Sequence, residues 1–226
     1  MPAPSSTSNE VDKALDAAKQ LGFFMKAHRK EKDLNGSVPD QSRVSLLLID
    51  VINDFEFEEA DRIFSNALAA STRIAAFKAR AKSAGIPVIY ANDNFGKWQS
   101  DFRKLLDHCL MDDVRGRPIA ALLKPDEDDY FVLKPKHSAF YSTTLELLLS
   151  YLGTRILILS GIATNNCVLF TASDAYMRDF RLVVPSDCVA SPSLTDDENA
   201  LELMRTVLKA DTTVSPEIDI ARLMKE

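Results

Sequence analysis

Three residues that lie far apart along the chain could together carry out nucleophilic chemistry: Asp50, Lys134 and Cys167. Asp50 and Lys134 each end an apolar run, where a charged side chain is costly unless it is paired. Cys167 follows the polar triplet 164–166 at the expected start of a helix. A helix N-terminus and a neighbouring ammonium both lower the pKa of a thiol, and the thiolate is the reactive form of cysteine. These residue types therefore point to covalent catalysis by Cys167, with Asp50 as acid and base.

The other cysteines and acids lack this context. Cys109 and Cys188 are widely spaced from each other and from Cys167, so neither a disulfide framework nor a zinc clip is predicted. We expect both thiols to be packed as small hydrophobic groups. Asp54 is interpreted as a loop or capping residue, and Lys136 as a surface lysine.

The elements that must position the three residues alternate between strand and helix. Apolar runs typical of buried parallel strands occupy 44–51, 86–92, 130–134, 155–160 and 181–184, with a sixth at 212–214. Helical periodicity covers 62–84, 98–110, 143–152, 165–179 and 196–209. This alternation predicts a three-layer α/β/α, Rossmann-like fold with a central, mostly parallel sheet of about six strands. Ligands bind beyond the carboxyl ends of such strands, which is where the three residues fall.

Two segments of the chain are expected to differ in organisation. Residues 1–42 lie outside the strand–helix pattern and should form an N-terminal arm, partly disordered and partly helical. Residues 43–226 should form the main α/β domain. The arm would suit subunit contacts, so a homo-oligomer is expected.

Composition and charge exclude several classes of function. The net charge of −6 argues against nucleic acid as a partner, because phosphate binding needs a basic surface. The sequence shows no secretory signal and no apolar stretch that could span a bilayer, so we expect a cytoplasmic protein with no membrane partner. It contains neither a GxGxxG motif nor a phosphate-binding loop, which disfavours a nucleotide cofactor.

Three segments together resemble the isochorismatase-like cysteine hydrolase family, which includes nicotinamidases and N-carbamoylsarcosine amidohydrolases. They are 47–55 (LLIDVINDF), 132–140 (VLKPKHSAF) and 160–168 (SGIATNNCV). Their order and spacing match the family, and the similarity covers roughly residues 43 to 215. The resemblance implies a hydrolase that acts on a small molecule without a cofactor.

The resemblance also implies roles for individual residues. Asp50, Lys134 and Cys167 would form a catalytic triad that works through a thioester. A cis peptide would join Ile162 and Ala163, and the backbone N–H groups of Ala163 and Cys167 would form an oxyanion hole. For substrate binding we expect Phe55, Asn92, Trp98 and Phe140 to contribute the walls of the pocket.

The substrate class follows from what the sequence lacks. Nicotinamidases of the family often hold a metal with an Asp and two His, but the three histidines here are not spaced as ligands, so no metal site is predicted. We therefore expect hydrolysis of a C–N bond in a small amide, ureido or carbamoyl compound. An isochorismatase-type hydrolysis of a C–O (vinyl ether) bond is one alternative, and a non-catalytic oligomeric binding protein is another.

Overall fold

The structure, a computed structural model, describes residues 41–93 and 101–225. Most of the expected N-terminal arm therefore lies outside the described residues. The strands are β1 (Val44–Ile49), β2 (Val88–Asp93), β3 (Tyr130–Lys134), β4 (Ile156–Ile162), β5 (Arg181–Val183) and β6 (Val189–Ala190). The helices are α2 (Ala60–Ser83), α3 (Phe102–Met111), α4 (Arg117–Leu122), α5 (Leu145–Leu152), α6 (Leu169–Tyr176), α7 (Leu194–Thr206) and α8 (Ile220–Leu223). Short turns of π-helix (Thr164–Val168) and 3₁₀-helix (Ser215–Glu217) complete the set.

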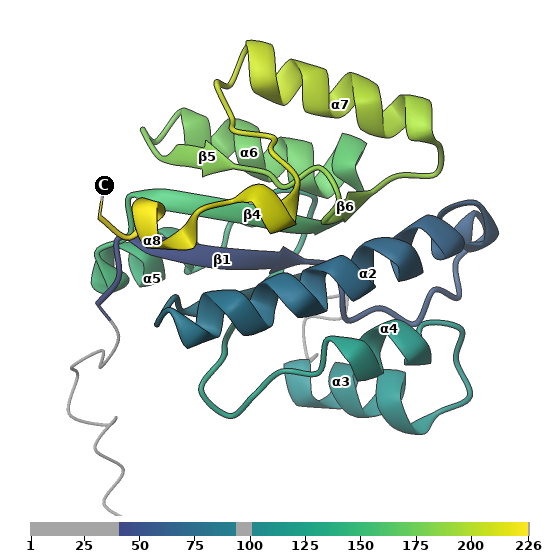
Figure 1. Ribbon diagram of the computed structural model, residues 1–226. Helices are drawn as coiled ribbons and strands as arrows, with labels where there is room; N and C mark the ends of the chain where they lie inside the picture. Colours follow the sequence, from purple (N-terminus) through teal and green to yellow (C-terminus); the bar gives the residue numbers. More distant parts are fainter. Residues whose placement is uncertain (1–40, 94–100, 226) are drawn as a thin grey trace, which may run out of the picture. The chain divides into compact units, whose positions relative to one another are not determined.

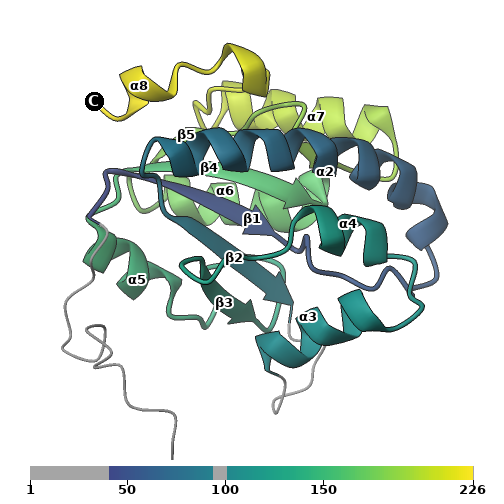
Figure 2. The same ribbon diagram turned by 60° about the horizontal axis from the view of Figure 1, so that its bottom comes forward.

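The six strands form one sheet. Five of them follow the order β3-β2-β1-β4-β5, and the sixth, β6, pairs with the carboxyl end of β4, beyond the part of β4 that pairs with β5. All the pairs are parallel. The predicted α/β architecture with a mostly parallel sheet is therefore confirmed. β1 lies in the middle, with β4 on one side (Figure 1) and β2 on the other (Figure 2), so the order of strands reverses there. Such a reversal opens a crevice beyond the carboxyl ends of the two central strands.

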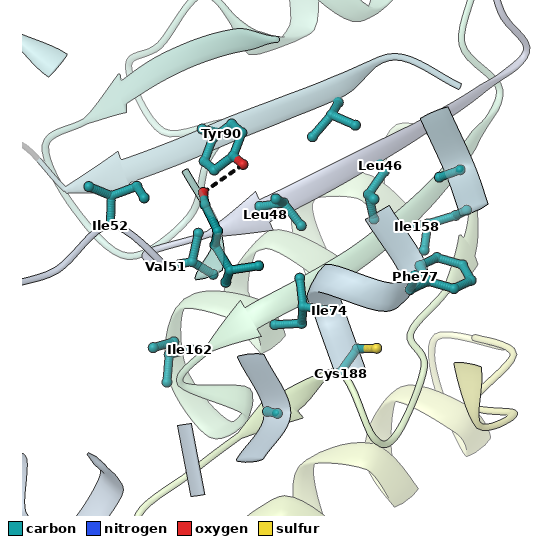
Figure 3. Close-up of a cluster of buried hydrophobic side chains, with 14 of the residues drawn as sticks. Leu46, Leu48, Val51, Ile52, Ile74, Phe77, Tyr90, Ile158, Ile162 and Cys188 are labelled. Atoms are coloured by element: carbon teal, nitrogen blue, oxygen red, sulfur yellow. Dashed lines mark hydrogen bonds between the residues drawn. The ribbon is translucent and has the colours of Figure 1, made fainter. Parts of the chain in front are cut away.

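The core forms because alternate residues of each strand point to opposite faces of the sheet. Leu46 and Leu48 of β1 pack toward Ile74 and Phe77 of α2, together with Ile158 of β4 (Figure 3). Every residue of β1 is buried, which explains why its sequence reads as one continuous apolar run rather than an alternating one.

Helices cover both faces of the sheet. α2 crosses one face, and α5 and α6 lie behind the sheet when it is viewed from α2 (Figures 1 and 2). Gly153 ends α5 with φ +73, a left-handed conformation that glycine adopts without steric cost. None of the helices in the described ranges is long and apolar enough to cross a bilayer.

One prediction about the strands was wrong, and three short helical elements were not predicted. The sixth strand is Val189–Ala190 and not 212–214, where the Asp211 carboxylate accepts hydrogen bonds from Thr213 and turns the chain. A strand of two residues has no periodicity from which it could be recognised. The sequence reading also missed α4, α8 and the 3₁₀ turn, which are too short to show a helical repeat.

Candidate active site

A buried lysine links the ends of the central strands. Lys134 is the last residue of β3 and is fully buried. Its Nζ lies 2.8 Å from Oδ2 of Asp50 and 3.6 Å from Sγ of Cys167. Oδ2 of Asp93, at the end of β2, is 4.0 Å from the same nitrogen. An ammonium, a carboxylate and a thiol that are far apart in sequence therefore meet at the carboxyl edge of the sheet, where the strand order predicts a ligand site.

The backbone around Asp50 orients its carboxylate. Asp50 directly follows β1 with φ +52, a left-handed conformation that aspartate tolerates better than most residues. Its Oδ1 accepts a hydrogen bond of 2.8 Å from the backbone N–H of Asp93. Oδ2 is then directed to Lys134, so both carboxylate oxygens are engaged.

Cys167 lies on a π-helical turn, Thr164–Val168, that leads into α6. The N–H of Val168 donates to the carbonyl oxygen of Ala163 at 3.1 Å, which closes the wider ring of this turn. The sequence predicted an ordinary helix over 165–179; single π turns of this kind are frequent at functional sites. The peptide bond between Ile162 and Ala163 is cis, as the family resemblance implied.

Two contacts anchor this turn from outside. Thr164 is fully buried, and its hydroxyl is hydrogen-bonded to the carboxylate of Asp197 on α7. The N–H of Asn165 donates to the hydroxyl of Ser191, which in turn donates to Oδ1 of Asn165. The position of Cys167 therefore depends on the segment after β6 and on α7 as well as on its own helix.

Burial dominates the acid–base properties of the three groups. Desolvation raises the pKa of Asp50 even though Lys134 lowers it. Burial and the negative charge of Asp50 raise the pKa of Cys167 to about 12, against the lowering effect of Lys134. Burial alone would lower the pKa of Lys134, but the charges of Asp50 and Cys167 outweigh it and the pKa is raised. The expected depressed thiol pKa was wrong, because the sequence shows Lys134 as a neighbour but not the desolvation.

The cluster opens on a cavity of about 850 Å³. Its described wall contains Asp50, Asn53, Phe55, Phe57, Glu59, Ile63, Asp93, Pro135, His137, Ile162, Ala163, Asn165, Asn166, Cys167, Phe170 and Pro192. Asp50, Ala163 and Cys167 thus share a wall with apolar and amide side chains. A small molecule in this cavity would lie against the thiol and the carboxylate.

The structure brings together only part of the predicted pocket wall. Phe55 lines the cavity. Asn92 does not, because its Nδ2 donates to the carbonyl oxygen of Ile52 and the residue is buried. Phe140 is buried against Phe180 and under the guanidinium of Arg178, so it belongs to the packing and not to the cavity wall. Trp98 lies outside the described residues.

Several lining residues were missed by the sequence reading. Asp93 is the next residue after Asn92 and is in register with Lys134 across β2 and β3. Residues in register point to the same face of a parallel sheet, so pairing with Lys134 could have selected Asp93 instead of Asn92. His137 and Phe170 stack on each other with ring centroids 5.5 Å apart, and neither shows a signal in the sequence.

No metal ligand set involves this cavity in the part of the chain that the structure describes. Among the described residues, the acidic side chains close enough together to hold a metal ion are those of Asp126, Asp128 and Asp129. All three contact Lys82, and none of them lines the cavity. His137 reaches the cavity, whereas His108 contacts Asp54 and Asp112. Cys109 and Cys188 are fully buried.

The fold is that of the isochorismatase-like α/β hydrolases. The solved structure of N-carbamoylsarcosine amidase from Thermoplasma acidophilum matches with a TM-score of 0.62 and 26% identity, over 78% of this chain and 99% of that one. A model of the isochorismatase domain matches residues 44–215. The chain therefore belongs to the isochorismatase family of hydrolases, which includes amidohydrolases.

Curated relatives agree with this assignment. The chain is 42% identical over 174 residues to YaaI, an uncharacterized isochorismatase family protein of Bacillus subtilis, covering 77% of this chain and 95% of that protein. It is 32% identical over 169 residues to an isochorismatase of the same organism, covering 73% of this chain. The match spans only 54% of that isochorismatase, about half of its length.

Proposed function

We propose that this protein is an amidohydrolase that cleaves the C–N bond of a small amide, ureido or carbamoyl compound through a thioester on Cys167. The observation that carries the proposal is the position of Lys134, whose buried ammonium contacts both Asp50 and Cys167 beside the cavity. The similarity to an N-carbamoylsarcosine amidase, which acts on a carbamoyl compound by its name, also supports a C–N bond.

The protonation states set the order of events. Because the pKa of Cys167 is raised to about 12, its sulfur carries a proton in the resting enzyme at neutral pH. Asp50, whose negative charge raises the pKa of the thiol, has a raised pKa itself and is therefore a stronger base than an ordinary carboxylate. Asp50 thus accepts the thiol proton as Sγ attacks, and Lys134 stabilises the negative charge that passes between them.

The reaction then proceeds in two halves. In the first, Sγ bonds to the carbonyl carbon, the C–N bond breaks, and Asp50 returns its proton to the leaving nitrogen. In the second, Asp50 takes a proton from water, the hydroxide attacks the thioester carbon, and the C–S bond breaks. Cys167 recovers its proton from Asp50, so the sum is amide plus water giving carboxylic (or carbamic) acid plus amine.

The backbone N–H groups of Ala163 and Cys167 are proposed to bind the oxyanion of both tetrahedral intermediates. Both residues line the cavity. In comparable hydrolases one such donor lowers the barrier by about 3 kcal/mol.

Vinyl ether hydrolysis is the second candidate, because the chain is 32% identical to an isochorismatase. In that reaction Asp50, in its protonated form, would protonate the substrate. The triad alone therefore does not distinguish cleavage of an amide C–N bond from cleavage of a vinyl ether C–O bond. A non-catalytic binding protein on the same fold would instead leave Cys167 unacylated.

Acyl-enzyme trapping tests the proposal. Purified protein is mixed with a panel of amides, ureido compounds and isochorismate, quenched in acid, and digested for mass spectrometry. We expect an acyl adduct on Cys167 with at least one C–N substrate, and no turnover in Cys167→Ala. Cys109→Ala is the matched control because that thiol is buried away from the cavity. Turnover of isochorismate alone would favour the second candidate, and turnover that survives in Cys167→Ala would contradict the role of the thiol.

We also propose that the enzyme works in the cytoplasm as a homo-oligomer. All three cysteines are unpaired, which suits a reducing compartment. Large apolar side chains are exposed on α5 and just after α6, such as Leu147 (61%) and Met177 (71%), and subunit contacts would cover them. Light scattering of the full chain should give a mass of two or more times 25.1 kDa, and a mass of 25.1 kDa would contradict the oligomer.

A further inference from the structure

The described wall of the cavity is acidic. It carries three carboxylates, Asp50, Glu59 and Asp93, and neither a lysine nor an arginine among the residues that the structure describes there. Lys134 is fully buried and offsets only one of the two negative charges next to it, those of Asp50 at 2.8 Å and Asp93 at 4.0 Å, so this group of three residues remains negative. Glu59 contacts Arg62 at 3.3 Å, but both side chains are exposed and such pairs are weak.

This distribution of charge discriminates between ligands. A carboxylate held in the cavity would lie among like charges with no described cation to pair with it, and like charges across an interface are strongly unfavourable. A neutral group meets the amides of Asn53, Asn165 and Asn166, and a cation meets the carboxylates. The charges of the described wall therefore favour the binding of neutral and positively charged ligands over negatively charged ones.

The apolar part of the same wall is aromatic. The rings of Phe55 and Phe57 are 6.0 Å apart, and those of His137 and Phe170 are stacked at 5.5 Å. Phe57 and Phe170 remain 47% and 51% exposed although they are large apolar side chains. Exposed rings beside a polar site offer flat faces on which another planar group, or a cation, can stack.

We infer that this cavity selects amides whose acyl or amine part is planar and either neutral or positively charged, and that it rejects amides that carry a carboxylate. The inference rests on the proposed function and names its substrate class. It also separates this chain from the isochorismatase that it resembles, because isochorismate is a dicarboxylate.

Turnover of a matched series tests the charge preference. The substrates are benzamide, 4-amidinobenzamide and 4-carboxybenzamide, which share one ring and one amide and differ only in the charge of the para group. We expect kcat/KM for the carboxylate to be lower than for benzamide by about tenfold or more, and the amidine to equal or exceed benzamide. A carboxylate that is hydrolysed as fast as benzamide would overturn the inference.

A pair of charge reversals links the preference to the cavity. Glu59→Lys and Glu58→Lys change the net charge of the chain equally and at neighbouring positions, but only Glu59 lines the cavity. We expect Glu59→Lys to narrow the ratio of benzamide to 4-carboxybenzamide turnover by about threefold or more, and Glu58→Lys to leave the ratio unchanged. Equal ratios in both variants would place the discrimination elsewhere and contradict the inference.

A binding measurement separates failure of this inference from failure of the proposed function. Benzamidine and benzoate are titrated into Cys167→Ala by calorimetry, with Phe170→Leu in the same background to test the ring contact. We expect benzamidine to bind, benzoate to bind at least about tenfold more weakly, and Phe170→Leu to weaken benzamidine. Benzoate binding as tightly as benzamidine, or benzamidine not binding, overturns the inference even in an active amidase. Selective benzamidine binding without any acylation of Cys167 keeps the inference and refutes the proposed reaction.

Discussion

Asn165 and Ser191 form two hydrogen bonds of 3.1 Å with each other. The hydroxyl of Ser191 accepts one from the backbone N–H of Asn165 and donates the other to the side-chain oxygen Oδ1 of Asn165. Asn165 lies two residues before Cys167, and Ser191 directly follows β6. Ser191 is fully buried, so water does not replace it as a partner. The pair joins the turn that carries the thiol to the last short strand of the sheet.

Removal of this hydroxyl should therefore lower activity. In Ser191→Ala both hydrogen bonds to Asn165 are lost from the positioning of the nucleophile, and we expect kcat to fall about five- to tenfold, which corresponds to a net loss of about 1 kcal/mol. Ser193→Ala is the control, because Ser193 caps α7 at the N–H of Asp196 and its loss should cost about 1 kcal/mol of stability with kcat unchanged. Steady-state kinetics and urea unfolding of both variants check this, and equal kcat in the two would contradict it.

The raised thiol pKa predicts an unusual response to removal of the acid. The charge of Asp50 raises the pKa of Cys167 and Lys134 lowers it, so Asp50→Asn should lower that pKa from about 12. Alkylation of Cys167 by iodoacetamide at neutral pH should therefore become faster in Asp50→Asn, while amide turnover is lost.

The dependence of the alkylation rate on pH is a second test of the direction in which Asp50 shifts the pKa of Cys167. In the wild-type protein the rate should keep rising with pH beyond the range of a free thiol, toward about 12. In Asp50→Asn it should level off at lower pH. Mass spectrometry of the Cys167 peptide measures both, with the buried Cys109 as internal reference; slower labelling in the variant would show that Asp50 does not suppress the thiolate.

Lys134 should be essential for activity as well as for stability. Lys134→Met keeps the length of the side chain but leaves Asp50 buried without its ammonium, which in comparable buried pairs costs about 3 to 5 kcal/mol of folding free energy. Because the pKa of Asp50 would then rise further, the carboxylate would be protonated and unable to accept the thiol proton. We expect kcat/KM to fall by a factor on the order of a thousand or more, within the range of acid–base contributions.

The neighbouring lysine provides the matched control for this variant. Lys136 is exposed and does not line the cavity, so Lys136→Met should change neither activity nor thermal stability measurably. A Lys134→Met protein that is folded by circular dichroism and retains near-normal turnover would argue against any role for this ammonium in the reaction.

Two glycines should respond very differently to one added methyl group. Gly161 has φ +119, and a Cβ there would lie 2.0 Å from the carbonyl oxygen of Ile49 in the neighbouring strand β1. Gly161→Ala should therefore separate the strands that carry Asp50 and Cys167, with a loss of about 4 kcal/mol or more. Gly153 has φ +73 but open space around it, so Gly153→Ala should cost about 1 kcal/mol. Denaturant unfolding compares the two, and similar losses would contradict the close approach of the strands.

The sequence by itself determined the architecture and the three chemical groups. The continuous apolar run that ends at Asp50 indicates a buried parallel strand, and β1 is indeed buried along its whole length. The run that ends at Lys134 was also recognised as a strand, but β3 lies at the edge of the sheet, where Phe131 is 53% exposed. Alternation of these runs with helical segments was enough to place both residues, and Cys167, at one edge of the sheet. Local pattern suffices here because strands and long helices are recognised over several residues of periodicity.

The tertiary structure decided which side chains meet and in what state of protonation. Asn92 and Asp93 are adjacent in the sequence, but only Asp93 is in register with Lys134, and that register is set by pairing between strands. The raised pKa values of Asp50 and Cys167 come from desolvation, which depends on chain segments distant from both. Phe170 and His137 meet only because α6 packs beside the loop after β3. A sequence shows which groups are present, whereas burial and register are properties of the whole packed chain.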